Sequence, residues 1–247
     1  MVNIVIAFTV LFLLIPRCKS PEGSTGVKEE ILEFSTNAGA DGAGLTISFH
    51  KGKEHNHPLM ALWAEDTNGV YLQTLYVANS IAKGIFQHGD ASSGKWKPGE
   101  IRRPAALPYW AHKRGIKGED GLFIPSAENP LPDAVSGETP PGSFLLHTWL
   151  KEGTPGIVNV YFEINQSWDW NEYWTNNKYP GNDEYKTSCQ PAVVYKATVD
   201  FNDNKETYKF QAIGHSHYAG ENGELYTDLS TLTTALDITG EIIVKER

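Results

Sequence analysis

Alternating apolar and polar residues, broken by short polar turns, run through most of this chain. In residues 44–50, Leu45, Ile47 and Phe49 alternate with polar neighbours, and residues 157–165 follow the same rule. A period of two predicts strands with one face against a core. Apolar patterning and β-prone composition predict further strands at residues 30–36, 59–65, 70–78, 143–149, 191–200, 207–213 and 236–244.

Turn signals join these segments into hairpins. Asn68-Gly69 separates residues 59–65 from 70–78, and Asn-Gly between β-prone runs is a strong hairpin signal. Residues 202–205 predict a second hairpin, between residues 191–200 and 207–213. About nine strands with polar turns predict an all-β protein, an immunoglobulin-like β-sandwich.

Residues 80–142 differ from this pattern. They are rich in Pro and Gly and show poor periodicity, apart from a short helix expected at residues 105–113. Their basic residues are gathered at Lys95, Lys97, Arg102, Arg103, Lys113 and Arg114. A stretch of this length without clear strands is too long for a connection, so we expect an ordered insertion that carries function, within one domain spanning residues 30–247.

The N-terminus predicts export. Residues 4–15 form an unbroken apolar run, well short of the about 20 residues that a transmembrane helix needs. Its length suits a signal peptide over residues 1–18, followed by a linker over residues 19–29. Cys18 stands where bacterial lipoproteins carry their lipid, although Arg17 replaces the small residue expected before it. Lipid anchoring and simple cleavage both stay open, and either predicts a protein of the periplasm or outer membrane.

Charge and cysteine content narrow the partners. The net charge is −9, and no basic stripe is present, so we expect no nucleic-acid partner. Two cysteines do not make a disulfide scaffold. We expect membrane contact only through a lipid on Cys18.

Several blocks of the sequence resemble a known family. They are ALWAEDTNG (residues 61–69), QTLYV (73–77), Arg103 with ALPYW (106–110), the loop at 133–139, residues 163–174 and GHSHY (214–218). Together they resemble a family of predicted periplasmic proteins, domain of unknown function 2271. The hairpin at residues 59–78 also resembles the immunoglobulin-like domain of flagellar hook-capping proteins. The first resemblance implies periplasmic location and association with flavin-linked and iron-related membrane redox proteins, but no established activity.

Two histidine pairs are candidate metal ligands. His55 and His57 precede one strand, and His215 and His217 follow another. On extended backbone, residues i and i+2 point to the same side, so each pair could present two imidazoles to one ion. If the pairs met, four nitrogen ligands would suit a transition metal such as zinc, copper or iron. The alternative is that each pair lies on a separate polar loop.

Residues 133–139 (DAVSGET) resemble a site at which periplasmic flavin transferases attach flavin mononucleotide to a threonine. The matching hydroxyl is Thr139, but Glu138 replaces the usual alanine. A carboxylate beside the attachment point would repel the flavin phosphate. This charge argument favours a plain Ser-Gly turn over covalent flavin attachment.

A Trp-rich segment could bind a ligand. Trp168, Trp170 and Trp174 are interleaved with Asp169 and Glu172, a mixture suited to stacking on sugars or binding cations. Asp169 and Glu172 could also act as paired acid and base in glycoside hydrolysis. A sandwich edge with packed aromatics explains the same pattern.

These patterns favour a binding or accessory module of the cell envelope, using His55, His57, His215 and His217, over an enzyme. No nucleophile elbow, phosphate loop, dinucleotide fingerprint or His-Glu-x-x-His helix occurs in the sequence, and we assign no catalytic residue. We expect its partner to be a membrane transport or redox protein. The alternatives are a carbohydrate-active enzyme and a structural subunit of an outer-membrane receptor.

Overall fold

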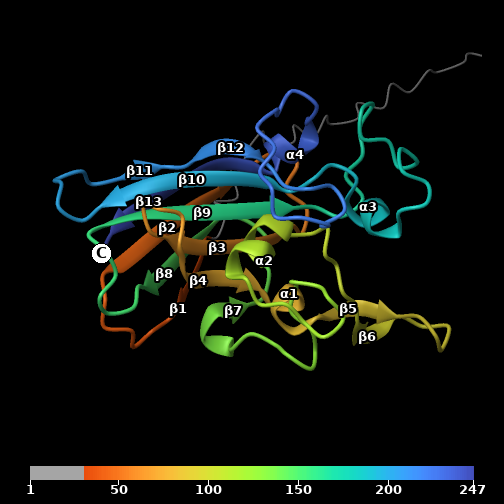
Figure 1. Ribbon diagram of the computed structural model, residues 1–247, viewed down its shortest axis with the longest axis horizontal. Coiled ribbons are helices and arrows are strands. Elements are labelled where there is room, and N and C mark those ends of the chain that lie inside the picture. The colour runs from red at the N-terminus through yellow and green to blue at the C-terminus, as the bar shows by residue number, and fades with distance from the viewer. Residues whose placement is uncertain (1–30) are drawn as a thin grey trace, which may run out of the picture.

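Two β-sheets packed face to face form the body of the protein (Figure 1). The structure, a computed structural model, describes residues 31–247. The predicted signal peptide, Cys18 and the linker therefore lie outside the described residues. Within residues 31–247, no helix combines the length and apolar character needed to cross a bilayer.

The first sheet has five strands, and only its edge pair β1–β8 is parallel. Its central pairs are antiparallel, with Phe49 of β2 opposite Phe144 of β8. In spatial order the strands are β1 (Leu32–Thr36), β8 (Phe144–Trp149), β2 (Gly44–Lys51), β13 (Thr239–Glu246) and β11 (Tyr208–Lys209).

The second sheet has six strands and carries the predicted Asn-Gly hairpin. Gly69 adopts φ +81°, and the Asp66 carboxylate accepts the backbone N–H groups of Asn68 and Val70, which closes the turn between β3 and β4. In spatial order the strands are β12 (Gln211–His215), β10 (Val193–Asp200), β9 (Ile157–Asn165), β3 (Leu59–Glu65), β4 (Tyr71–Ala78) and β7 (Ser136–Gly137).

The all-β sandwich predicted from the sequence is confirmed, and its core lies between the two sheets. Side chains that alternate along facing strands fill it, including Leu45 and Ile47 of β2 and Val160 and Phe162 of β9. All four are at most 1% exposed. Fully buried side chains of this size each contribute about 1.5 to 3 kcal/mol to folding.

The insertion covers the outer face of the second sheet. Ala61 and Trp63 of β3 pack on that face in a second apolar cluster, together with Leu107 and Trp110 of the insertion. Its elements are α1 (Asn79–Lys83), β5 (Ile85–Asp90), β6 (Lys97–Glu100), α2 (Pro108–Arg114), the short 3-10 turn η1 (Asp133–Val135) and β7. The insertion is thus ordered, and β5 and β6 are strands that the sequence pattern did not reveal.

Two expected strands differ from the structure. The strand predicted at residues 207–213 is divided at Phe210, so that β11 pairs with β13 in the first sheet and β12 pairs with β10 in the second. The predicted hairpin therefore holds only for β10 and β12. The strand predicted at residues 236–244 begins later, because helix α4 (Thr234–Asp237) precedes β13.

Candidate functional site

A cavity of about 540 Å³ lies where the insertion meets the ends of β3 and β9. Most of its wall comes from the loop before β3, the α1–β5 region, Arg103 and the segment after β7. Ser167, just beyond β9, completes it. The polar groups that face it include His57, Ser80, His88, Arg103, Thr139 and Ser167. We call this space the Arg103 cavity.

Arg103 supplies the positive charge of the cavity. Its Nη1 donates to the Ser167 hydroxyl at 2.7 Å, and its guanidinium carbon lies 4.5 Å from the centre of the Phe86 ring. Burial lowers the pKa of Arg103, and the nearby Glu184 opposes that shift. Among the described residues no carboxylate forms an ion pair with this guanidinium. A half-buried cation that keeps open donors is a ready partner for an anion.

His57 lines the cavity from a polar turn, and its backbone is not extended as the prediction of paired imidazoles assumed. Its backbone has φ +51°, so residues 55–57 are not extended. Its Nδ1 lies 3.0 Å from the Asn56 side-chain oxygen, which places the proton of the neutral ring on Nδ1 and leaves Nε2 as an acceptor. The backbone N–H of Asn56 donates to the side-chain oxygen of Gln166 at 2.8 Å, which joins this loop to the end of β9.

Thr139 and Glu138 line the same cavity. The Tyr76 hydroxyl donates to the Glu138 carbonyl at 2.8 Å, and β7 pairs with β4, so this segment is held against the second sheet. Glu138 is the only carboxylate among the described lining residues. A phosphate near Thr139 would therefore meet Arg103 as well as the repelling Glu138.

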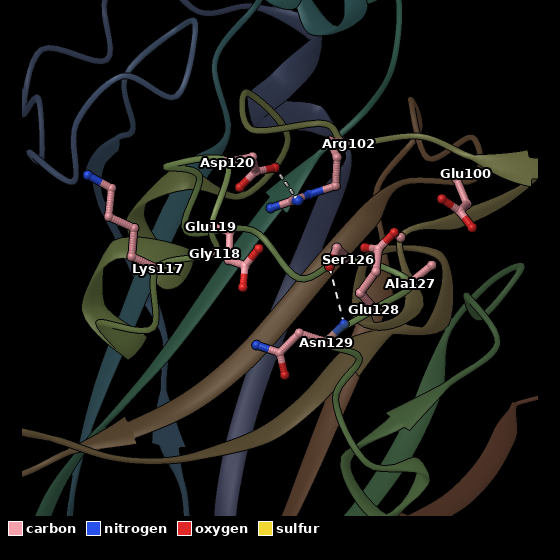
Figure 2. A pocket seen from close by; sticks show the side chains of 11 residues that line it. Glu100, Arg102, Lys117, Gly118, Glu119, Asp120, Ser126, Ala127, Glu128 and Asn129 are labelled. Atoms are coloured by element: carbon pink, nitrogen blue, oxygen red, sulfur yellow. Dashed lines mark hydrogen bonds and ion pairs between the residues drawn. The ribbon is translucent and has the colours of Figure 1, made fainter.

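A larger cavity, of about 960 Å³, is lined within the described residues by four carboxylates and only two cations, Arg102 and Lys117 (Figure 2). Arg102, the sequence neighbour of Arg103, lines this cavity and forms an ion pair with Asp120. Glu100, Glu119 and Glu128 supply further carboxylates. Consecutive arginines thus line different cavities, and of the two only Arg102 has a carboxylate within ion-pair distance among the described residues.

The second histidine pair belongs to a ring cluster at the end of β12. His215 is 7% exposed and stacks on Tyr226 at 5.4 Å, with Trp174 edge-on at 6.0 Å. Its Nδ1 donates to the Ser216 carbonyl at 2.8 Å. His217 stacks on Tyr218, and its Nδ1 accepts backbone N–H groups from Ala219 and Glu221. Burial lowers the pKa of both histidines, so they are neutral rings engaged in packing.

The four histidines do not form one site. In the part of the chain that the structure describes, no three side chains of His, Cys, Asp or Glu are placed to hold a metal ion. His55 lies against Phe49, whereas His57 faces the Arg103 cavity, because the turn at His57 sends the two rings in different directions. The four histidines therefore do not converge in the described residues, and metal binding by them stays a prediction.

Glu163 is a buried acid that joins the second sheet to the insertion. Its carboxylate accepts the backbone N–H groups of Tyr109 at 3.1 Å and Trp110 at 2.7 Å, at the start of α2. It also bonds Ser216, and burial raises the pKa of Glu163 to about 8. Its partners are backbone amides and a buried hydroxyl, so Glu163 is a positioning group for α2.

The Trp-rich segment divides into exposed and structural residues. Trp168 and Trp170 are 62% and 53% exposed, whereas Trp174 is 6% exposed and donates to the Thr231 hydroxyl. Asp169 accepts from Thr234, and burial raises the pKa of its carboxyl. Glu172 is exposed. Asp169 is therefore engaged in joining two loops, and these contacts give no support to a catalytic pair.

Comparisons with known proteins identify no relative of this chain. The chain matches no protein-family model, no curated protein and no solved structure. The resemblance to domain of unknown function 2271 stays a prediction. In the sequence, Arg103 stands in the basic cluster and in a block that resembles a known family, but neither pattern gave it a role in a site. Ser80, Phe86, His88 and Ser167 were not predicted as site residues.

Proposed function

We propose that this protein is a non-catalytic binding module of the bacterial cell envelope that holds a phosphate- or carboxylate-bearing anion in the Arg103 cavity. The observation that carries the proposal is the guanidinium of Arg103, which lines a cavity and has no carboxylate within ion-pair distance among the described residues, Glu184 acting on it only from farther away. Burial disfavours the charged guanidinium, and a bound anion would add a close counter-charge to the attraction of the more distant Glu184.

The lining of the cavity indicates the chemistry of the ligand. Arg103 suits a phosphate or carboxylate group, and the hydroxyls of Ser80 and Thr139 suit its remaining oxygens. Leu59, Ile85 and Phe86 provide apolar surface for the body of the same molecule. A phosphate- or carboxylate-bearing molecule with an apolar or planar part fits this combination.

The apolar run at residues 4–15 and the family resemblance support the envelope location. The family resemblance also supports a membrane transport or redox protein as the partner. The four-histidine metal site is not part of this proposal, because the residues do not converge.

A thermal-shift series tests the function. The full chain would be heated with pyrophosphate, citrate or flavin mononucleotide, each against chloride at equal ionic strength. We expect at least one of the anions to raise the melting temperature in a saturable manner, because a ligand of the folded state stabilises it by mass action. If all three give the same melting temperature as chloride, the Arg103 cavity is not an anion site.

A further inference from the structure

The β5–β6 hairpin stands apart from both main sheets and projects from the body of the protein (Figure 1). At its base the Ile101 amide donates to the Gly84 carbonyl at 2.9 Å. Along its length the backbones approach closely, since a Cβ on Gly89 would lie 2.2 Å from the Gly99 carbonyl oxygen. An isolated two-stranded hairpin is only marginally stable in water, so this one needs its anchored base and its glycine contact.

A tryptophan is displayed at the end of the hairpin. We call residues 91–98 the hairpin tip. Trp96 is 68% exposed, the largest exposure among the big hydrophobic side chains described. The turn that carries it is ordered: the Gly94 amide donates to Ala91 at 3.0 Å, and the Ser92 amide donates to Asp90 at 2.7 Å.

The charge of the hairpin tip is opposite to that of the whole chain. Lys95 and Lys97 flank Trp96, and residues 91–98 contain no acid, although the net charge of the protein is −9. Lys97 lies 3.0 Å from Asp90, which fixes that side chain beside the strand pair. The insertion as a whole has eight basic and seven acidic residues, so the negative charge resides in the rest of the chain.

We propose that the hairpin tip docks on the surface of a bilayer that contains anionic phospholipid. The indole of Trp96 would lie among the headgroups, where amphipathic aromatic rings are most favourable, and Lys95 would contact lipid phosphates. The four residues of the hairpin tip that precede Lys95 have small side chains, namely Ala91, Ser92, Ser93 and Gly94. They supply no apolar rim of the kind that surrounds a protein–protein hot spot, so a lipid surface is the better match.

Vesicle binding by the full chain tests this proposal. Phosphatidylcholine vesicles with and without phosphatidylglycerol would be sedimented with the wild type, Trp96→Ala, Lys95→Gln and Trp168→Ala. Trp168 is a matched control, because its side chain is almost as exposed but lies on another loop. We expect phosphatidylglycerol to increase binding, Lys95→Gln to weaken it about five-fold and Trp96→Ala to weaken it more. Trp168→Ala should bind like the wild type.

Fluorescence quenching is a second measurement, and it reports on Trp96 even if another part of the chain also binds the vesicles. Brominated lipid should quench less of the tryptophan fluorescence in Trp96→Phe than in the wild type, because the quenched ring is the one removed. The proposal is overturned if Trp96→Ala sediments with vesicles like the wild type and brominated lipid quenches Trp96→Phe as much as the wild type. It is also overturned if Trp96→Ala and Trp168→Ala lose binding equally. Binding to a protein partner that needs Trp96, without vesicle binding, would contradict it as well.

Discussion

Arg103 donates a hydrogen bond to Ser167 at 2.7 Å and thereby connects the insertion to the segment that follows β9. The two residues are far apart in sequence, and their contact closes one side of the Arg103 cavity. The Phe86 ring supports the same guanidinium from another element. The charged group is thus oriented before any ligand arrives, which lowers the entropic cost of binding.

Glu163→Gln should reduce the pH dependence of folding stability. The pKa of Glu163 is raised from 4.5 to about 8 by burial, so the folded state keeps its proton at pH values where the unfolded chain has lost it. The stability contributed by this group is complete below the unfolded pKa and is lost as the pH rises through the folded one. Urea unfolding of the wild type and Glu163→Gln at several pH values between those two pKa values measures this loss of stability. We expect the difference in unfolding free energy to change with pH by at most about 1.4 kcal/mol per unit.

The exposed Glu172→Gln serves as the control for Glu163→Gln and should parallel the wild type at every pH. Parallel stability profiles for the wild type and Glu163→Gln would contradict the assignment of a raised pKa to Glu163.

Glu138→Ala should strengthen anion binding in the Arg103 cavity. It removes the only carboxylate among the described lining residues and leaves the guanidinium in place. For a partly exposed charge we expect a gain in affinity of about two- to five-fold, measured by calorimetry with pyrophosphate. Glu128→Ala, in the larger cavity, is the matched control. A loss of affinity in Glu138→Ala would show that Glu138 assists the ligand.

His215→Ala should destabilise the fold without changing its metal content. The change empties a buried space between Tyr226 and Trp174, so we expect a loss of about 1 to 3 kcal/mol in urea unfolding. The exposed His50→Ala should stay within about 0.5 kcal/mol of the wild type. Elemental analysis of untagged wild-type protein after zinc, copper and iron supplementation should find no stoichiometric metal. One bound metal per chain that disappears in His215→Ala would restore the metal hypothesis.

Asp169→Ala and Glu172→Ala should behave differently. Asp169 joins its loop to Thr234, so its loss leaves buried polar groups without a partner and should cost about 1 to 3 kcal/mol. Glu172 is exposed, and its replacement should change stability by less than about 0.5 kcal/mol. Chemical unfolding of both variants distinguishes them. Full stability of Asp169→Ala, together with hydrolysis of a glycan by the wild type, would favour the enzyme alternative.

The strands were predictable because the apolar pattern reports burial. β9 has the predicted bounds, residues 157–165, and the Asn-Gly turn joins β3 to β4 as expected. β3 is buried along its whole length, since Met60 and Leu62 face the sandwich core while Ala61 and Trp63 face the insertion. Its nearly continuous apolar sequence indicates a strand covered on both faces.

The site was less predictable, because it depends on contacts between distant segments. Two imidazoles on one side of residues 55–57 would need extended backbone, and the positive φ of His57 breaks that geometry. Phe210 divides an apparently continuous strand, because each half pairs in a different sheet. Asp120 forms an ion pair with Arg102 and not with Arg103. No local pattern of residues in the sequence predicts this choice.

Isothermal titration of the wild type, Arg103→Gln and Arg102→Gln with pyrophosphate tests the central claim most directly. Arg103 is the cation that we place in the binding cavity, and Arg102 is its sequence neighbour in the other cavity. We predict that Arg103→Gln weakens binding at least about ten-fold, as expected for the loss of charge-assisted hydrogen bonds, while Arg102→Gln keeps the wild-type affinity. Equal affinity in all three proteins, or a loss confined to Arg102→Gln, would contradict the account.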